Sequence, residues 1–195
     1  MNLSAVLLAG GASRRMGRDK PSLAWSGVNL LVHQAKTLRL TGAQQLLLSR
    51  RPGQTWLIEG FGLVTDSEFD AGPAAALADV WRATNAHILV ALAVDLPQMP
   101  PEYLREMAVG AMQQERSVVP MLAGRYEPLA AAWHRSCLAE FFGSAGRSLQ
   151  SICATLAKQG LLTTREVSDG EARLFENLNT PEDYDRLGSE NIPAS

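Results

Sequence analysis

Residues 4–20 read SAVLLAGGASRRMGRDK, an apolar run that passes directly into a polar, glycine-rich loop. The run 4–9 predicts a strand buried on both faces, as in the centre of a parallel sheet. Gly10 and Gly11 let the backbone turn sharply and approach a ligand, and successive amides there can form an anion-binding concavity. Four cations follow within seven residues, namely Arg14, Arg15, Arg18 and Lys20. Amides and cations together fit a triphosphate, whereas a surface turn with solvated basic residues is the alternative.

The rest of the chain alternates between strand-like and helix-like segments. Strands are predicted at 45–49, 61–65, 87–94, 117–121, 129–133 and 174–178. Helices are predicted at 30–40, 74–84, 101–114 and 148–159, and from Pro181 onward. The last helix has Thr180 as N-cap and Asp183 at the third helical position. This order predicts an α/β fold with a mainly parallel central sheet and helices on both faces.

Composition indicates a folded protein of ordinary make-up and excludes several classes. The chain has 195 residues, of which 46% are hydrophobic, and a net charge of −2. Nothing in this balance points to nucleic acid as a partner. No apolar stretch reaches the roughly 18 residues of a membrane span, and no signal peptide is apparent, so a cytoplasmic protein is expected. Cys137 and Cys153 do not form a disulfide or zinc pattern, so we expect two buried thiols.

Two aspartates follow predicted strands, as Gly10 does. Ligands of such sheets bind beyond the carboxyl ends of the strands, so we expect Gly10, Asp66 and Asp95 to line one cleft. Asp95 ends the longest apolar strand, before Leu96-Pro97. A carboxylate there can hold Mg²⁺ with few other protein ligands, because Mg²⁺ keeps water and shares substrate phosphates. A cap beside the proline for Asp95 and a simple turn for Asp66 are the alternatives.

Four patterns, in order along residues 5–186, carry a resemblance to a known family. They are Leu8-Ala9-Gly10-Gly11-x-Ser13-x-Arg15-Met16-Gly17-x-Asp19-Lys20, Asp66-Ser67 before Gly72-Pro73, Asp95-Leu96-Pro97, and Asn177-x-Asn179-Thr180-Pro181-Glu182-Asp183. The chain thereby resembles the molybdenum cofactor guanylyltransferases of the nucleotidyltransferase superfamily. The resemblance implies a three-layer Rossmann-like fold, which we expect as one domain over residues 1–187 with a flexible C-terminal tail over 188–195.

The resemblance also implies a reaction and a set of site residues. GMP would pass from GTP to molybdopterin with release of pyrophosphate, and Mg²⁺ would be the cofactor. The nucleotide-binding residues implied are Leu8, Ala9, Gly10, Gly11, Ser13, Lys20, Asp66 and Asp95. The catalytic residues implied are Arg15, Lys20 and Asp95, with Asp95 as the metal ligand. Asn177 and Asn179 would lie on the pterin side, although helix capping explains them equally well, and a molybdoenzyme or cofactor chaperone would be a protein partner.

Three positions depart from the family pattern and leave alternatives open. Ala76 stands where the family usually has the last glycine of Gly-Pro-Leu-Ala-Gly, and Ser49 stands where a strand usually ends in asparagine. Glu127-Pro128 replaces the usual Gln-Pro or His-Pro. The alternatives are a molybdopterin cytidylyltransferase, another small-molecule nucleotidyltransferase, or a non-catalytic nucleotide-binding module for a molybdoenzyme. The pair Gly10-Gly11 favours the guanylyl reading, and Lys20 with Asp95 argues against a non-catalytic module.

Overall fold

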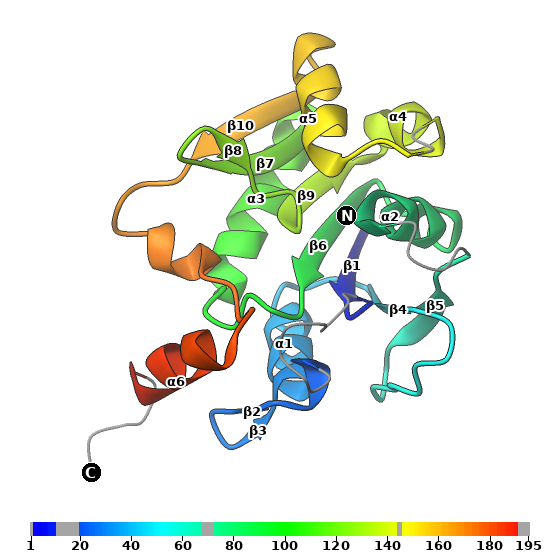
Figure 1. The fold of residues 1–195 in the computed structure, drawn as a ribbon. Helices are drawn as coiled ribbons and strands as arrows, with labels where there is room; N and C mark the ends of the chain where they lie inside the picture. The colour runs from blue at the N-terminus through cyan, green and yellow to red at the C-terminus, as the bar shows by residue number, and fades with distance from the viewer. Residues whose placement is uncertain (1, 11–19, 68–71, 144–145, 191–195) are drawn as a thin grey trace.

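The computed structural model describes residues 2–10, 20–67, 72–143 and 146–190 (Figure 1). Within these ranges the centre is an eight-stranded sheet of order β10-β7-β9-β6-β1-β4-β5, with β8 paired to β7. Its strands are β1 Leu3–Leu8, β4 Gln45–Arg50, β5 Gly62–Thr65, β6 Ile88–Ala93, β7 Ser117–Leu122, β8 Arg125–Tyr126, β9 Ala130–His134 and β10 Leu162–Glu166. A separate hairpin, β2 Ala24–Trp25 and β3 Val28–Asn29, follows a 3₁₀ helix at Lys20–Ser22.

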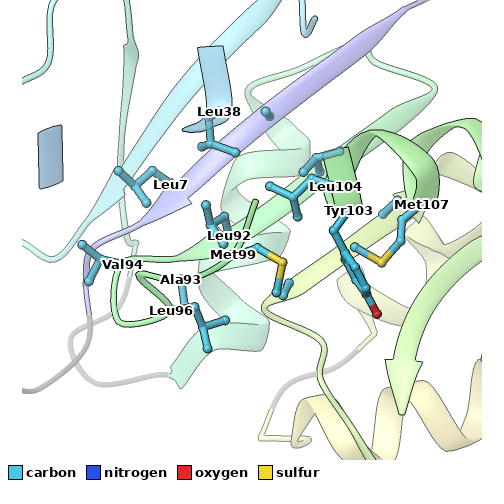
Figure 2. Packing of buried hydrophobic residues seen from close by; sticks show 14 of the residues in the cluster. Leu7, Leu38, Leu92, Ala93, Val94, Leu96, Met99, Tyr103, Leu104 and Met107 are labelled. Carbon is cyan, nitrogen blue, oxygen red and sulfur yellow. The ribbon is translucent and has the colours of Figure 1, made fainter. Parts of the chain in front are cut away.

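Helices cover both faces of the sheet, which makes three layers (Figure 1). One face carries α1 Leu30–Arg39, α3 Pro101–Gln114 and α6 Pro181–Glu190, and the other carries α2 Gly72–Arg82, α4 Leu138–Phe142 and α5 Leu149–Lys158. Successive residues of β1 alternate between the two cores: Ala5 and Leu7 pack with the first set of helices, Val6 and Leu8 with the second. Figure 2 shows the first core, with Leu92 from the sheet and Leu104 from α3. The predicted α/β fold is confirmed.

Strand direction decides which loops meet at the site. β1 is parallel to β4 and β6, and β4 is parallel to β5, so these four strands end at one edge of the sheet. The registers Leu8↔Ser49 and Leu8↔Ala93 align three of these ends. β9 runs antiparallel to β6, with Leu92 opposite Ala130, and therefore begins where the other four strands end. The loop that precedes β9 thus reaches the same edge.

The C-terminal part combines one confirmed prediction with one that was wrong. The predicted cap of α6 is present, because Asp183 Oδ2 accepts from the backbone N–H of Thr180 while Thr180 Oγ1 accepts from that of Asp183. A strand at 174–178 is not formed. A 3₁₀ helix covers Ala172–Phe175, and the backbone N–H of Leu178 donates to Asp95 O at 2.9 Å, so this segment does not join the sheet.

Other expectations concern the chain as a whole. Cys137 and Cys153 are free and buried, as expected. No helix in the described ranges is both long enough and apolar enough to cross a membrane. α6 extends to Glu190, and residues 191–195 of the expected tail lie outside the described residues.

Candidate active site

A cleft of about 240 Å³ lies at the carboxyl ends of β1, β4, β5 and β6. The structure brings Gly10, Asp66 and Asp95 together on its wall, as the strand order requires. Its lining also includes Leu8, Ala9, Lys20, Pro21, Ser49, Arg51, Pro73 and Ala76. The cleft therefore combines an apolar surface from the end of β1 with two carboxylates and two cations. Gly11, Ser13 and Arg15, which the sequence assigns to the same site, lie outside the described residues.

Lys20 connects the N-terminal part of the cleft with two distant segments. Its ammonium donates to Asp95 Oδ2 at 3.0 Å and to Asn179 Oδ1 at 2.7 Å. The Lys20 and Asp95 side chains are 12% and 23% exposed, so the ion pair is partly shielded from water and open towards the cleft. An ammonium held here can meet phosphate oxygens next to the carboxylate that would carry a metal ion.

Asp66 occupies the opposite wall of the cleft. Its Oδ1 accepts a 2.9 Å hydrogen bond from the hydroxyl of Ser49, which is 1% exposed. A Cβ added to Gly10 would lie only 3.0 Å from Asp66 Oδ2, so glycine is what lets the chain pass this carboxylate. Burial raises the pKa of Asp66, with a further increase from Asp79, while the Ser49 hydrogen bond and the charge of Arg51 oppose the rise.

Buried contacts fix the turn that carries Asp95. Gln34 of α1 is fully buried, and its Nε2 donates to Leu96 O at 2.6 Å and to Ala93 O at 3.3 Å. Figure 2 shows Leu96 and Met99 after the turn, both 2% exposed and packed in the core. Because hydrogen bonds hold the backbone on both sides of Asp95, its carboxylate is presented to the cleft by a rigid element.

A second cavity, of about 590 Å³, adjoins the first and shares Asp95 with it. Besides Asp95, its polar lining residues are Arg125, Tyr126, Glu127, Ser148, Gln150 and Asn177. Burial raises the pKa of Glu127; the charge of Arg125 opposes this rise and that of Asp95 adds to it. Asn177 thus lies by the second cavity, whereas Asn179 contacts Lys20, so the structure separates two residues that the sequence pairs.

Arg51 is a cleft residue to which sequence reasoning gives no role. It lies directly after β4, at the same edge as Asp66, and its charge acts on that carboxylate. Its position in the sequence could have indicated a role in the cleft, because a basic residue that follows a parallel strand of such a sheet lies at the edge where ligands bind.

The surroundings of Asp95 are also suited to bind Mg²⁺, the divalent ion that the sequence predicts. Among the described residues, no group of three or more histidine, cysteine, aspartate or glutamate side chains could enclose a metal. A single carboxylate in a cleft that also contains the Lys20 ammonium instead matches Mg²⁺, which completes its shell with water and substrate phosphates. The donors present therefore fit an ion that arrives with its nucleotide.

Comparisons with known proteins agree with this geometry. The family model "MobA-like NTP transferase domain" matches residues 5–160. A relative from Xanthomonas euvesicatoria, named "Molybdenum cofactor guanylyltransferase", is 32% identical over 195 residues, covering 96% of this chain and 95% of the relative.

Two solved structures share the fold over nearly the whole chain. "Molybdopterin-guanine dinucleotide biosynthesis protein A" from Archaeoglobus fulgidus superposes with a TM-score of 0.76 at 22% identity, covering 96% of this chain and 97% of that one. A Mycobacterium tuberculosis protein in complex with manganese has a TM-score of 0.69 at 21% identity and covers 98% and 100%. The family inferred from the motifs is confirmed: the chain belongs to the MobA-like NTP transferase family and is thereby a nucleotidyltransferase.

Proposed function

We propose that the protein transfers GMP from GTP to molybdopterin and releases pyrophosphate. The observation that carries this proposal is the position of Asp95, which lines both the cleft at the strand ends and the adjoining cavity. A transfer reaction needs its two substrates to meet at one charged centre, and this residue lies where the two spaces join. The Xanthomonas relative, a molybdenum cofactor guanylyltransferase by name, supports GTP and a molybdenum cofactor precursor as the substrates.

The cleft is proposed to bind the nucleotide through both its apolar and its charged walls. Leu8, Ala9 and Gly10 would face the guanosine, and Asp66 would accept hydrogen bonds from its N–H or O–H groups. Lys20 would contact the triphosphate, together with Gly11, Ser13 and Arg15 of the loop outside the described residues. Mg²⁺ held by Asp95, when bound, would neutralise charge on the triphosphate.

The residues of the chain then need to provide position and charge rather than proton transfer. An oxygen of the acceptor phosphate attacks the α-phosphorus of GTP, and the bond from that phosphorus to the β-phosphate oxygen breaks, with pyrophosphate leaving. The attacking group is already an anion, so no general base is required. Lys20 would stabilise the negative charge on the phosphates at the point where it develops.

The second cavity is proposed to bind the pterin acceptor, with Asn177 among its polar groups. Arg125 supplies a cation for the acceptor phosphate, and Glu127 supplies a half-buried carboxylate that can accept from ring N–H groups.

We include Mg²⁺ as the divalent ion, supported by the manganese bound to the M. tuberculosis neighbour. The free thiols of Cys137 and Cys153 suit the reducing cytoplasm, which we propose as the location, and a molybdoenzyme or its chaperone is the proposed recipient of the product.

The first test is calorimetric binding of GTP, CTP and ATP in the presence of Mg²⁺, followed by transfer assays with molybdopterin. We expect the protein to prefer GTP and to form a guanine dinucleotide with stoichiometric pyrophosphate. Preference for CTP would replace guanylyl by cytidylyl transfer, and tight GTP binding without turnover of the pterin would favour a non-catalytic nucleotide-binding module.

A further inference from the structure

The Lys20 ammonium is held by Asn179, which lies far along the chain from Lys20. Its contact with Asn179 Oδ1, at 2.7 Å, is shorter than its contact with Asp95 Oδ2, at 3.0 Å, and it joins residues 159 positions apart. We infer that Asn179 is a positioning residue, which acts through Lys20 to keep the ammonium directed at the triphosphate. The inference rests on the proposed function only in making Lys20 a triphosphate ligand.

Asn179 itself is fixed by its backbone. Its main-chain N–H donates to Asp183 Oδ2 at 3.0 Å, within the cap of α6. The preceding residue, Leu178, is fully buried, and its N–H donates to the backbone oxygen of Asp95. Among the described contacts the side chain of Asn179 does not cap α6. Its amide oxygen accepts from Lys20, while its backbone is held by the cap.

The same helix also holds the chain just after Lys20. The hydroxyl of Tyr184, in α6, donates to the backbone oxygen of Ala24 at 2.6 Å. Both partners of the Lys20–Asn179 bond are therefore linked to α6 within a few residues. The family model ends at residue 160, so this support comes from the part of the chain beyond the matched domain.

The physical benefit of this arrangement is preorganisation. A lysine side chain has four rotatable bonds and loses much rotamer freedom when it binds an anion. A neutral amide oxygen can restrain the ammonium without cancelling its charge, whereas Asp95 alone would hold it as an ion pair. If the carboxylate of Asp95 is shared with a metal ion, Asn179 still holds Lys20 in place, so that less entropy is lost when the triphosphate binds.

The test is a double-mutant cycle that measures the binding of Mg²⁺-tripolyphosphate, which has neither base nor ribose, by calorimetry. Asn179→Ala is expected to weaken binding by roughly three- to tenfold, which corresponds to the net contribution of one typical hydrogen bond. In the Lys20→Ala background, Asn179→Ala should have no further effect, because it acts through Lys20. Arg105→Ala is the control, since it removes an exposed ion pair of α3 with Glu102 away from the cleft and should leave binding unchanged.

Three outcomes would overturn the inference. The first is an equal loss from Asn179→Ala with and without Lys20, and the second is a comparable loss from Arg105→Ala. The third is no loss from Asn179→Ala in the wild-type background, including the case in which the wild type itself does not bind the probe. Because no nucleotide is transferred in this assay, the result is independent of whether GTP and molybdopterin are the substrates. A coupled loss in a protein that fails to transfer GMP would uphold the role of Asn179 and reject only the proposed reaction.

Discussion

Ser49 donates a 2.9 Å hydrogen bond from its hydroxyl to Oδ1 of Asp66, and this bond joins the carboxyl ends of β4 and β5 inside the cleft. Burial raises the pKa of Asp66, and Ser49 is the largest influence against that rise. Ser49 therefore limits the rise in the pKa of a candidate nucleotide ligand.

Ser49→Ala should raise the pKa of Asp66 further, because the carboxylate loses a donor that favours its charged form. If ionised Asp66 binds the nucleotide, affinity falls as the pH drops through this pKa, and the variant should lose affinity at a higher pH than the wild type. Calorimetric titration with GTP from about pH 8 to about pH 4 measures both midpoints. Coincident midpoints would show that Ser49 does not control Asp66.

Gly10→Ala should damage the cleft, because the new Cβ would lie 3.0 Å from Asp66 Oδ2 and 3.3 Å from Arg51 Cγ. Shifting these groups should weaken GTP binding about tenfold and cost roughly 1–3 kcal/mol of unfolding free energy. Gly110→Ala is the control: its Cβ would lie 3.6 Å from Val118, and it should stabilise α3 by about 0.5–1 kcal/mol. Unchanged GTP affinity in Gly10→Ala would mean that the nucleotide does not use this wall.

Asp95→Ala should lower kcat by roughly 10²–10³-fold while leaving the fold intact. The loss of stability should stay below about 1 kcal/mol, because the ion pair with Lys20 is partly exposed and Lys20 keeps its bond to Asn179. Pyrophosphate release at saturating GTP, molybdopterin and Mg²⁺ measures the first quantity, and urea unfolding measures the second. Substantial residual Mg²⁺-dependent turnover would remove Asp95 from the metal site.

Gln34→Leu should destabilise the protein by about 1–3 kcal/mol, because the backbone oxygens of Ala93 and Leu96 would lose a buried donor. Urea unfolding of the variant beside the wild type measures this change. Gln113→Leu, at an exposed position of α3, should shift stability by no more than about 0.5 kcal/mol. Equal effects of the two substitutions would show that the turn that carries Asp95 does not depend on Gln34.

Glu171 should make stability depend on acid pH. Its hydrogen bond with Arg165, and further bonds from Ser168, lower its pKa from 4.5 to about 2. A carboxyl whose pKa is lower in the folded state stabilises the protein above its unfolded pKa, and this contribution is lost as the pH falls from about 4.5 to about 2. Glu171→Gln should therefore reduce stability at neutral pH and flatten the loss over that interval, as followed by urea unfolding at each pH. An unchanged acid limb would contradict this assignment.

The sequence predicts best the strands that lie at the centre of the sheet and are buried on both faces. β1 and β6 are buried along their whole length and read as continuous apolar runs, so their central place in the sheet could be inferred. By contrast, β10 contains Thr163, Thr164 and Arg165 and lies at an edge, where no apolar pattern is needed. Its presence depends on pairing with β7, which is a tertiary property.

The residues around 174–178 mislead for a related reason. Phe175 and Leu178 are both buried and resemble a short strand in sequence, yet the backbone of Leu178 bonds to the turn at Asp95 rather than to a sheet neighbour. By contrast, the alternation of strands and helices correctly predicts that Lys20 and Asp95 share one site. The same alternation cannot reveal that Asn179 reaches the ammonium, because that contact depends on how α6 docks.

The antiparallel entry of β9 draws the linings of the cleft and of the adjoining cavity largely from separate lengths of chain. Arg51, Asp66 and Asp95 of the cleft lie just after the ends of parallel strands, whereas much of the adjoining cavity comes from one contiguous segment, Leu122–Leu129, that leads into β9. Recombination with crossover points in β7 and β9 would transplant this segment from one relative to another as a cassette. If the adjoining cavity binds the acceptor as proposed, acceptor preference could then diversify along a lineage while the residues of the cleft are inherited unchanged.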